Sequence, residues 1–75
     1  MEILFFGSLV DITSEPRLVV DHFENTELLK AHLTKKFPAL AKASYFIAVN
    51  RQMIEGNAPL TKEDSIALMP PFSGG

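Results

Sequence analysis

The residues whose types best suit chemistry stand at the end of the sequence, where Gly74 and Gly75 follow residues 70–73, Pro-Pro-Phe-Ser. Each proline removes a backbone donor, so a β-strand cannot run through Pro70 and Pro71. We therefore expect the chain to leave any sheet at Pro70 as a stiff, extended segment. Six extended residues reach about 20 Å, which is enough to cross a second protein's surface and enter a narrow active site.

A terminal carboxylate on Gly75 is the reactive group that this segment would present. Such a carboxylate has a pKa of about 3.5, so it is ionised at neutral pH and must be activated before a nucleophile can attack it. Glycine at positions 74 and 75 leaves room for the reagents to approach. The sequence holds no glycine-rich loop that could cradle a phosphate. We therefore expect a separate enzyme to activate the Gly75 carboxylate with ATP. Two glycines alone fit a frayed terminus equally well, and the double proline favours a directed tail.

Other side chains that could carry chemistry form no recognisable pattern. His22 and His32 lack metal-ligand spacing to each other or to a carboxylate, and we expect His32 to be a partly packed structural residue. Ser44 and Ser73 show no arrangement with a histidine and a carboxylate. We therefore expect no metal site and no active site belonging to this chain alone.

Composition narrows the class of protein further. The 75 residues contain no cysteine, 47% hydrophobic residues, and seven basic against nine acidic side chains for a net charge of −2. That charge lacks the basic excess of a nucleic-acid binder. No run approaches the about 20 apolar residues needed to span a membrane, and the first residues lack the pattern of a signal peptide. We expect a single small cytoplasmic domain that binds neither nucleic acid nor membrane.

The elements that must position the tail can be read from short apolar runs and their breaks. A helix is predicted over residues 25–37, capped by Asn25 or Thr26 and carrying Leu29, Leu33 and Phe37 on one stripe. Pro38 should end it. Residues 10–16 are polar enough to be a hairpin loop. Strands are predicted at residues 3–6, 18–20, 45–49, 52–54 and 65–69.

This order of elements predicts an α+β fold of the β-grasp, or ubiquitin-like, type. One main helix should lie across one face of a mixed sheet. The first and last strands are apolar almost throughout, which indicates that they are parallel neighbours at the centre of the sheet. We expect residues 1–69 to form the domain and residues 70–75 to form the extended tail.

The sequence resembles the small subunits of molybdopterin synthase, the sulfur carriers of molybdenum-cofactor biosynthesis. The resemblance runs through residues 3–6 (Ile-Leu-Phe-Phe), 48–50 (Ala-Val-Asn) and 59–64 (Pro-Leu-Thr-Lys-Glu-Asp). It is most specific at residues 68–75, where Leu-Met precedes Pro-Pro-Phe-Ser-Gly-Gly. The related thiamine carriers also end in Gly-Gly but usually lack the double proline.

The resemblance implies a carrier whose chemistry is performed by its partners. An adenylyltransferase resembling ubiquitin E1 would use ATP to adenylate Gly75, and sulfur would replace AMP to give a thiocarboxylate. Gly74 would permit access, and the tail with Pro70, Pro71 and Phe72 would enter the large synthase subunit, in a heterotetramer. Two such sulfurs would build the molybdopterin dithiolene. The chain itself would bind no cofactor and would not be an enzyme alone.

The resemblance also implies an outward apolar patch for both partners, at Phe6, Met53 and Met69. Each of these residues taken alone is also consistent with an ordinary core position. Methionine suits a shared surface because its flexible thioether adapts to different partners. The sequence departs from the family at Val10, where arginine is frequent, and at residues 11–16, which lack the usual glycine. Both departures bear on docking and neither touches the tail.

Three alternative functions stay open at this point. The first is a thiamine-pathway carrier with the same tail chemistry and a different acceptor, which the double proline argues against. The second is a protein modifier that joins Gly75 to lysines of target proteins. The third is a ubiquitin-like interaction module with an inert tail, which would tolerate the loss of Gly75.

Overall fold

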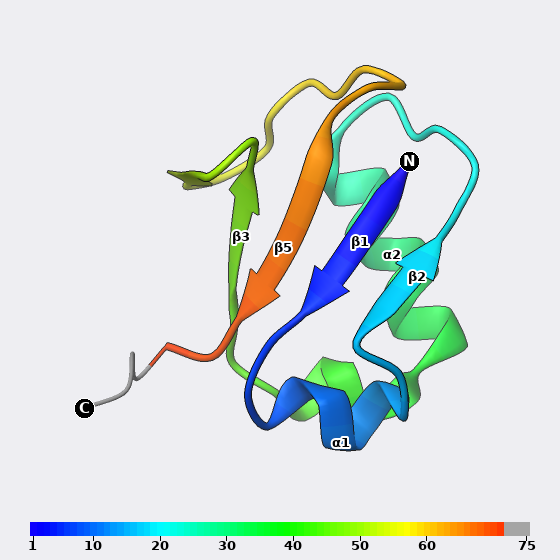
Figure 1. Ribbon diagram of the computed structural model, residues 1–75, viewed down its shortest axis with the longest axis vertical. Helices are drawn as coiled ribbons and strands as arrows, with labels where there is room; N and C mark the ends of the chain where they lie inside the picture. Colours follow the sequence, from blue (N-terminus) through cyan, green and yellow to red (C-terminus); the bar gives the residue numbers. More distant parts are fainter. Residues whose placement is uncertain (72–75) are drawn as a thin grey trace.

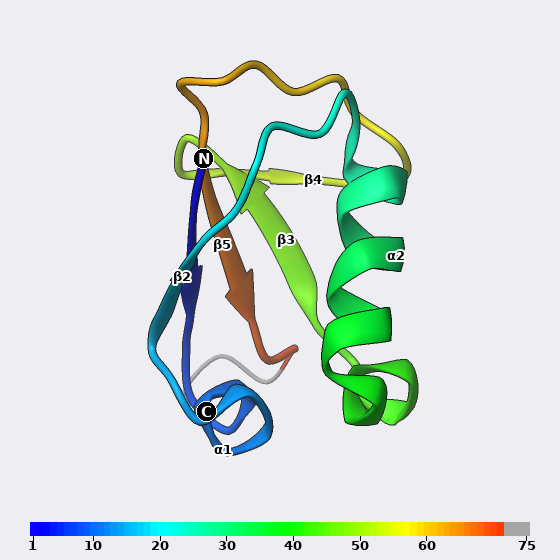
Figure 2. The same cartoon turned by 90° about the vertical axis from the view of Figure 1, so that its right-hand side faces the viewer.

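The computed structural model describes residues 1–71, and within them the chain folds into one mixed sheet with its main helix on a single face (Figures 1 and 2). The five strands lie in the order β2-β1-β5-β3-β4. The predicted α+β, β-grasp architecture is confirmed. The elements in chain order are β1 (Glu2–Phe5), α1 (Leu9–Thr13), β2 (Arg17–Val19), α2 (Thr26–Lys36), the 3-10 helix η1 (Pro38–Lys42), β3 (Phe46–Val49), β4 (Gln52–Ile54) and β5 (Ser65–Met69).

Strand β5 lies at the centre of the sheet. It runs parallel to β1, with Ile3 opposite Ile66, and antiparallel to β3, with Ile47 opposite Leu68. These four side chains point to the α2 side and are buried. The prediction that the first and last strands are parallel central neighbours is confirmed, and each of them has a strand on both sides.

Helix α2 covers the inner face of the sheet. The Asn25 side chain caps it by accepting a hydrogen bond from the Leu28 N–H at 3.0 Å. Leu29 and Leu33 are fully buried, and the half-buried Phe37 packs edge-to-face against Phe5 with ring centroids 6.1 Å apart. The predicted helix and its apolar stripe are confirmed, with Phe37 as the residue that caps its C-terminus.

One sequence prediction is wrong, because residues 10–16 are not simply a hairpin loop. They overlap the short helix α1, in which Leu9 and Thr13 are buried at four-residue spacing. The Thr13 hydroxyl bonds to the Leu9 and Glu15 carbonyls at 3.3 and 2.7 Å, and Ser14 ends the helix at φ 65°. A helix this short has little intrinsic stability, and its two buried side chains hold it in place.

Across residues 1–71, no helix is both long and apolar enough to cross a membrane.

Candidate functional site

The face of the sheet opposite α2 carries an apolar surface. Strand alternation places Ala48 and Ala67 opposite each other on this face, with Met53 beside Ala48. In the next row Phe46 lies opposite Met69. We call the surface formed by these residues the outer-face patch, together with Leu4 and with Phe6, which follows β1. Its members are Leu4, Phe6, Phe46, Ala48, Met53, Ala67 and Met69.

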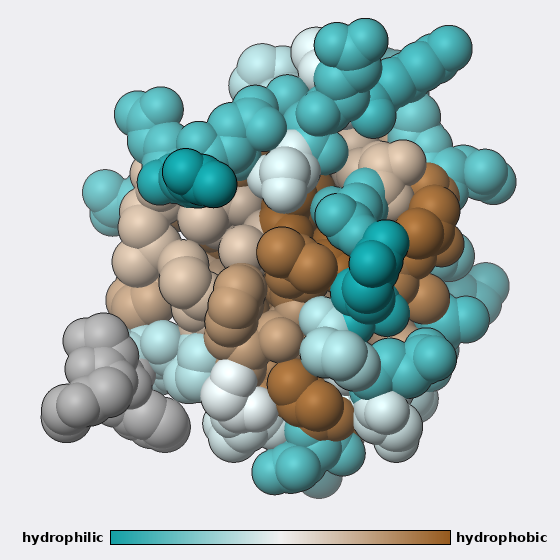
Figure 3. All heavy atoms as spheres, viewed as in Figure 1, coloured by the Kyte–Doolittle hydropathy of each residue, from teal (hydrophilic) through white to brown (hydrophobic). Residues whose placement is uncertain are grey.

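Three large side chains of the patch are exposed to solvent, and none of its members is charged. Phe6, Phe46 and Met53 are 46%, 42% and 53% exposed, which is unusual for large apolar side chains that lie close together. Figure 3 shows apolar side chains gathered over the middle of this face, above β3 and β5, with polar side chains around them. On the β2 side the patch is bounded by the ion pair between Arg17 and Glu2. An apolar surface with a polar rim is suited to binding another protein.

The structure brings Phe6, Met53 and Met69, the three residues named from the family resemblance, together on this one face. It adds Phe46, which the sequence analysis did not single out. Residues 46–49 are all apolar, so the run conceals which side chains face outward. The available signal was the alternation with Ile47, because a buried Ile47 forces Phe46 to the opposite face.

The patch ends where the tail begins. Met69 is the last residue of β5, Pro70 is half-buried, and Pro71 is exposed. Pro70 lies against the turn that follows β1, close to Gly7. The Phe6 N–H donates to the Leu68 carbonyl at 3.1 Å, which ties this turn to the end of β5. The predicted site residues Phe72, Gly74 and Gly75 lie outside the described residues.

A polar clasp holds the other end of β5. The Asp64 carboxylate accepts hydrogen bonds from the Thr61 N–H at 2.7 Å and the Asn50 amide at 2.8 Å. The side-chain amide oxygen Oδ1 of Asn50 in turn accepts a hydrogen bond from the Ser65 N–H at 2.9 Å. The bond from the Thr61 backbone, followed by that from Asn50, holds the pKa of Asp64 below its usual value of 3.8. The clasp is at the opposite end of β5 from Pro70, so its role is to fix the strand.

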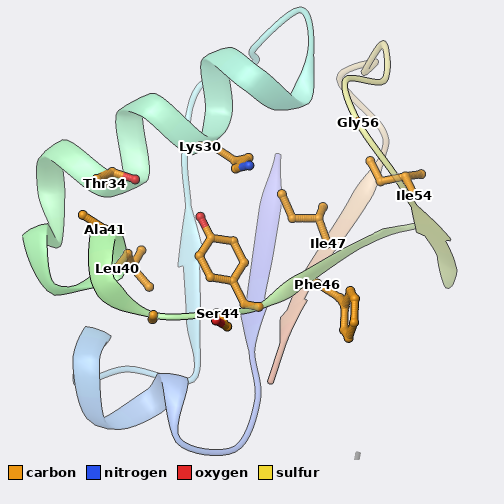
Figure 4. A pocket seen from close by; sticks show the side chains of 11 residues that line it. Lys30, Thr34, Leu40, Ala41, Ser44, Phe46, Ile47, Ile54 and Gly56 are labelled. Carbon is orange, nitrogen blue, oxygen red and sulfur yellow. The ribbon is translucent and has the colours of Figure 1, made fainter. Parts of the chain in front are cut away.

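A groove of about 500 Å³ runs between α2 and the β3–β4 side of the sheet. Figure 4 shows Lys30 and Thr34 of α2 facing Ile47 and Ile54 across it. Tyr45 also lines the groove, and burial, as the largest cause, raises the pKa of its hydroxyl, which is therefore neutral at physiological pH.

The two histidines have structural partners. The His22 ring nitrogen Nε2 lies 3.1 Å from the Leu60 carbonyl oxygen. His32 stacks on Phe23 with ring centroids 4.9 Å apart. Among residues 1–71 no three histidine, aspartate or glutamate side chains gather as metal ligands would. The surface with the clearest capacity for function is therefore the outer-face patch that adjoins Pro70.

A sheet in this order, one helix on its inner face and an apolar outer face together define a ubiquitin-like protein. The ThiS family model matches residues 3–75, and the chain belongs to this family of sulfur-carrier proteins. The match confirms the class of protein that the tail motif and the strand pattern had indicated.

Known proteins resemble the chain over its whole length. It is 28% identical over 80 aligned positions to the molybdopterin synthase sulfur carrier subunit of Escherichia coli (strain K12), covering 100% of this chain and 99% of that protein. The crystal structure of SAMP1 from Haloferax volcanii matches with a TM-score of 0.75 and 23% identity, covering 99% of this chain and 97% of that one. At that identity the SAMP1 likeness supports the fold alone.

Proposed function

We propose that this chain is the sulfur-carrier subunit of molybdopterin synthase, with Gly75 as the sulfur-bearing residue. The observation that carries the proposal is the segment Pro70-Pro71 followed by Gly74-Gly75, directly after the central strand β5. The full-length similarity to the Escherichia coli subunit supports it. In this proposal residues 1–69 are the docking domain and residues 70–75 are the reacting tail.

The proposed chemistry takes place on the Gly75 carboxylate. A carboxylate oxygen attacks the α-phosphate of ATP, and pyrophosphate leaves to give an acyl-adenylate. A hydrosulfide ion (HS⁻), or a donor that delivers sulfur at the same oxidation level, then attacks the carbonyl carbon. AMP departs with the oxygen that had joined it to Gly75, and the proton on sulfur is lost to solvent. The product is a thiocarboxylate, which delivers its sulfur toward the molybdopterin dithiolene. Gly74 and Gly75 keep the carbonyl open to each reagent because neither has a Cβ.

The catalytic groups for these steps belong to partners. An E1-like adenylyltransferase binds ATP and activates Gly75, and the large synthase subunit transfers the sulfur within a heterotetramer. The outer-face patch serves both encounters in turn, with Phe6, Met53 and Met69 as contacts. The adaptable thioethers of the two methionines allow one surface to fit two different proteins. The first part of the tail, Pro70, Pro71 and Phe72, contacts each partner as the tail enters that partner's active site.

A second candidate is the thiamine-pathway carrier, which the match to the ThiS family favours. It shares the adenylation and thiocarboxylation of Gly75 and differs in the enzyme that accepts the sulfur. The double proline favours the molybdopterin role. Transfer assays with the two acceptor systems separate these candidates, because only the true acceptor should discharge the thiocarboxylate at an appreciable rate.

Intact mass spectrometry of protein isolated from cells tests the carrier chemistry directly. We expect a second species, heavier by the difference between one sulfur and one oxygen atom, that disappears on incubation with the large subunit and the pterin precursor. The matched control is a chain lacking Gly75, which should show no such species. A chain that never acquires sulfur in cells containing an active E1-like enzyme would overturn the proposal. Isopeptide-linked targets would instead identify a protein modifier.

A further inference from the structure

Gly7 occupies the turn that joins β1 to α1, and both sides of this turn are fixed. On one side the Phe6 N–H bonds to the Leu68 carbonyl of β5. On the other side the Val10 N–H bonds to the Gly7 carbonyl at 3.2 Å, which starts α1. Gly7 itself has φ +59°, a conformation that glycine adopts freely and other residues rarely adopt.

The space beside Gly7 is filled by the first residue of the tail. A Cβ built on Gly7 would lie 2.8 Å from Cγ of Pro70 and 3.4 Å from Cδ. The Pro70 ring has little freedom to withdraw, because its φ is locked and the preceding residues are paired to β3 as well as β1. The Pro70 ring therefore packs directly against Gly7 at the point where the chain leaves the sheet.

We infer that Gly7 is a positioning residue that sets the direction in which the tail leaves β5. The inference rests on the proposed function, since the direction matters only if Gly75 must reach a partner's active site. Reacting atoms must come within about 3–3.5 Å, and a misplacement of about 1 Å can cost about 100-fold in rate. A deflection at Pro70 changes the direction in which the chain continues toward Gly75.

The chain supplies a matched control at Gly56. This glycine has φ +72°, close to that of Gly7, and a Cβ built there would meet nothing within 4 Å. Gly56→Ala therefore carries the same kind of backbone strain as Gly7→Ala and lacks the collision with Pro70. Any difference between the two variants beyond stability reports on the contact with the tail.

The experiment compares sulfur transfer by full-length chains carrying a chemically installed thiocarboxylate, in a single turnover with the large subunit and the pterin precursor. We expect Gly7→Ala to lower the maximal rate by at least about 10-fold while the half-saturating concentration of the large subunit changes by less than about 3-fold. Gly56→Ala should stay within about 2-fold of the wild type in both quantities. Denaturation by urea shows that each variant is folded under the assay conditions.

A double-mutant cycle with Pro70→Ala isolates the contact. Removing the Pro70 ring should relieve the collision, so the added methyl of Gly7→Ala should change the rate by less than about 2-fold in the Pro70→Ala background. The comparison of Pro70→Ala with the double variant also tests the inference about Gly7 if Gly7→Ala alone does not fold. Equal rates for Gly7→Ala and Gly56→Ala, or an undiminished effect of the added methyl in the Pro70→Ala background, would overturn the inference. Absence of transfer by the wild-type chain would overturn the proposed function instead.

Discussion

At the scale of single residues, Leu33 is the most direct probe of the contact between α2 and the sheet, because its side chain is fully buried. We expect Leu33→Ala to lower the free energy of unfolding by about 2–4 kcal/mol through the loss of buried methyl groups and the cavity that remains. Leu28→Ala is the matched control on the same helix, where the side chain is 50% exposed. Its effect should stay below about 0.5 kcal/mol in urea denaturation. Equal losses for the two variants would contradict the assigned helix face.

Asp64 makes stability depend on pH through its clasp with Thr61 and Asn50. Hydrogen bonds to the ionised carboxylate lower its folded-state pKa below 3.8, so the stabilisation is present above that value and is lost as pH falls through the lowered pKa. Asp64→Asn should therefore be less stable than the wild type at neutral pH, and the difference should shrink well below pH 3.8. Urea denaturation across this range measures it. A difference that is the same at all pH values would exclude this mechanism.

Residue-level chemistry was predictable where one side chain decides the outcome. Asn25 caps α2 and Pro38 follows its end, because a capping oxygen and a missing backbone donor act locally. The positive φ values of Ser14, Asn50 and Arg51 were not predictable in this way. They depend on the helix and strands on either side, which force the chain to turn at these positions.

At the scale of elements, the outer-face patch leads to a prediction about docking. Met69→Arg should abolish the complex with the large subunit while leaving the fold intact, because an unpaired charge in an apolar interface is heavily penalised. Val19→Arg is the control: Val19 lies opposite Glu2 near the edge of the same sheet and is 69% exposed, outside the patch. Binding measured by titration calorimetry should be unchanged by Val19→Arg. Normal binding by a folded Met69→Arg chain would remove the patch from the docking surface.

The strands and α2 were predictable because apolar runs, prolines and four-residue spacing are properties of the sequence itself. Helix α1 was not, because its burial of Leu9 and Thr13 depends on packing against the rest of the domain. Phe46 was missed for a related reason. A strand that is apolar throughout indicates burial on both faces, and only the sheet as a whole shows that its outer face is open to solvent.

At the scale of the whole molecule, the proposed function assigns folding to residues 1–69 and reaction to the tail, residues 70–75. Deleting Gly75 moves the carboxylate back by about 3.5 Å, which is incompatible with near-attack geometry. We expect unchanged thermal stability, since the buried core lies between Ile3 and Leu68, and no sulfur transfer. Adding one residue after Gly75 should be as damaging, because it converts the reactive carboxylate into an amide.

Thermal unfolding, complex formation and single-turnover transfer, measured on the same preparations, check this separation. Near-normal transfer by the truncated chain would contradict the role of Gly75. The β-grasp and the tail motif were both predictable, since the first follows from the order of elements and the second from six residues. The identity of the partner enzymes was inferred only from the family resemblance, because no physical property of one chain specifies which protein it binds.

The central position of β5 has a mechanical consequence. A partner that draws on the tail pulls β5 along its own axis, and the hydrogen bonds that hold a strand in a sheet lie across that axis. Pairs from Glu2–Ser65 to Phe5–Leu68 on one side, and from Val49–Ile66 to Phe46–Met69 on the other, would be loaded together in shear. They would not open one after another, as an edge strand peeled from one end would. Partners can therefore pull on the tail repeatedly without separating β5 from β1 and β3.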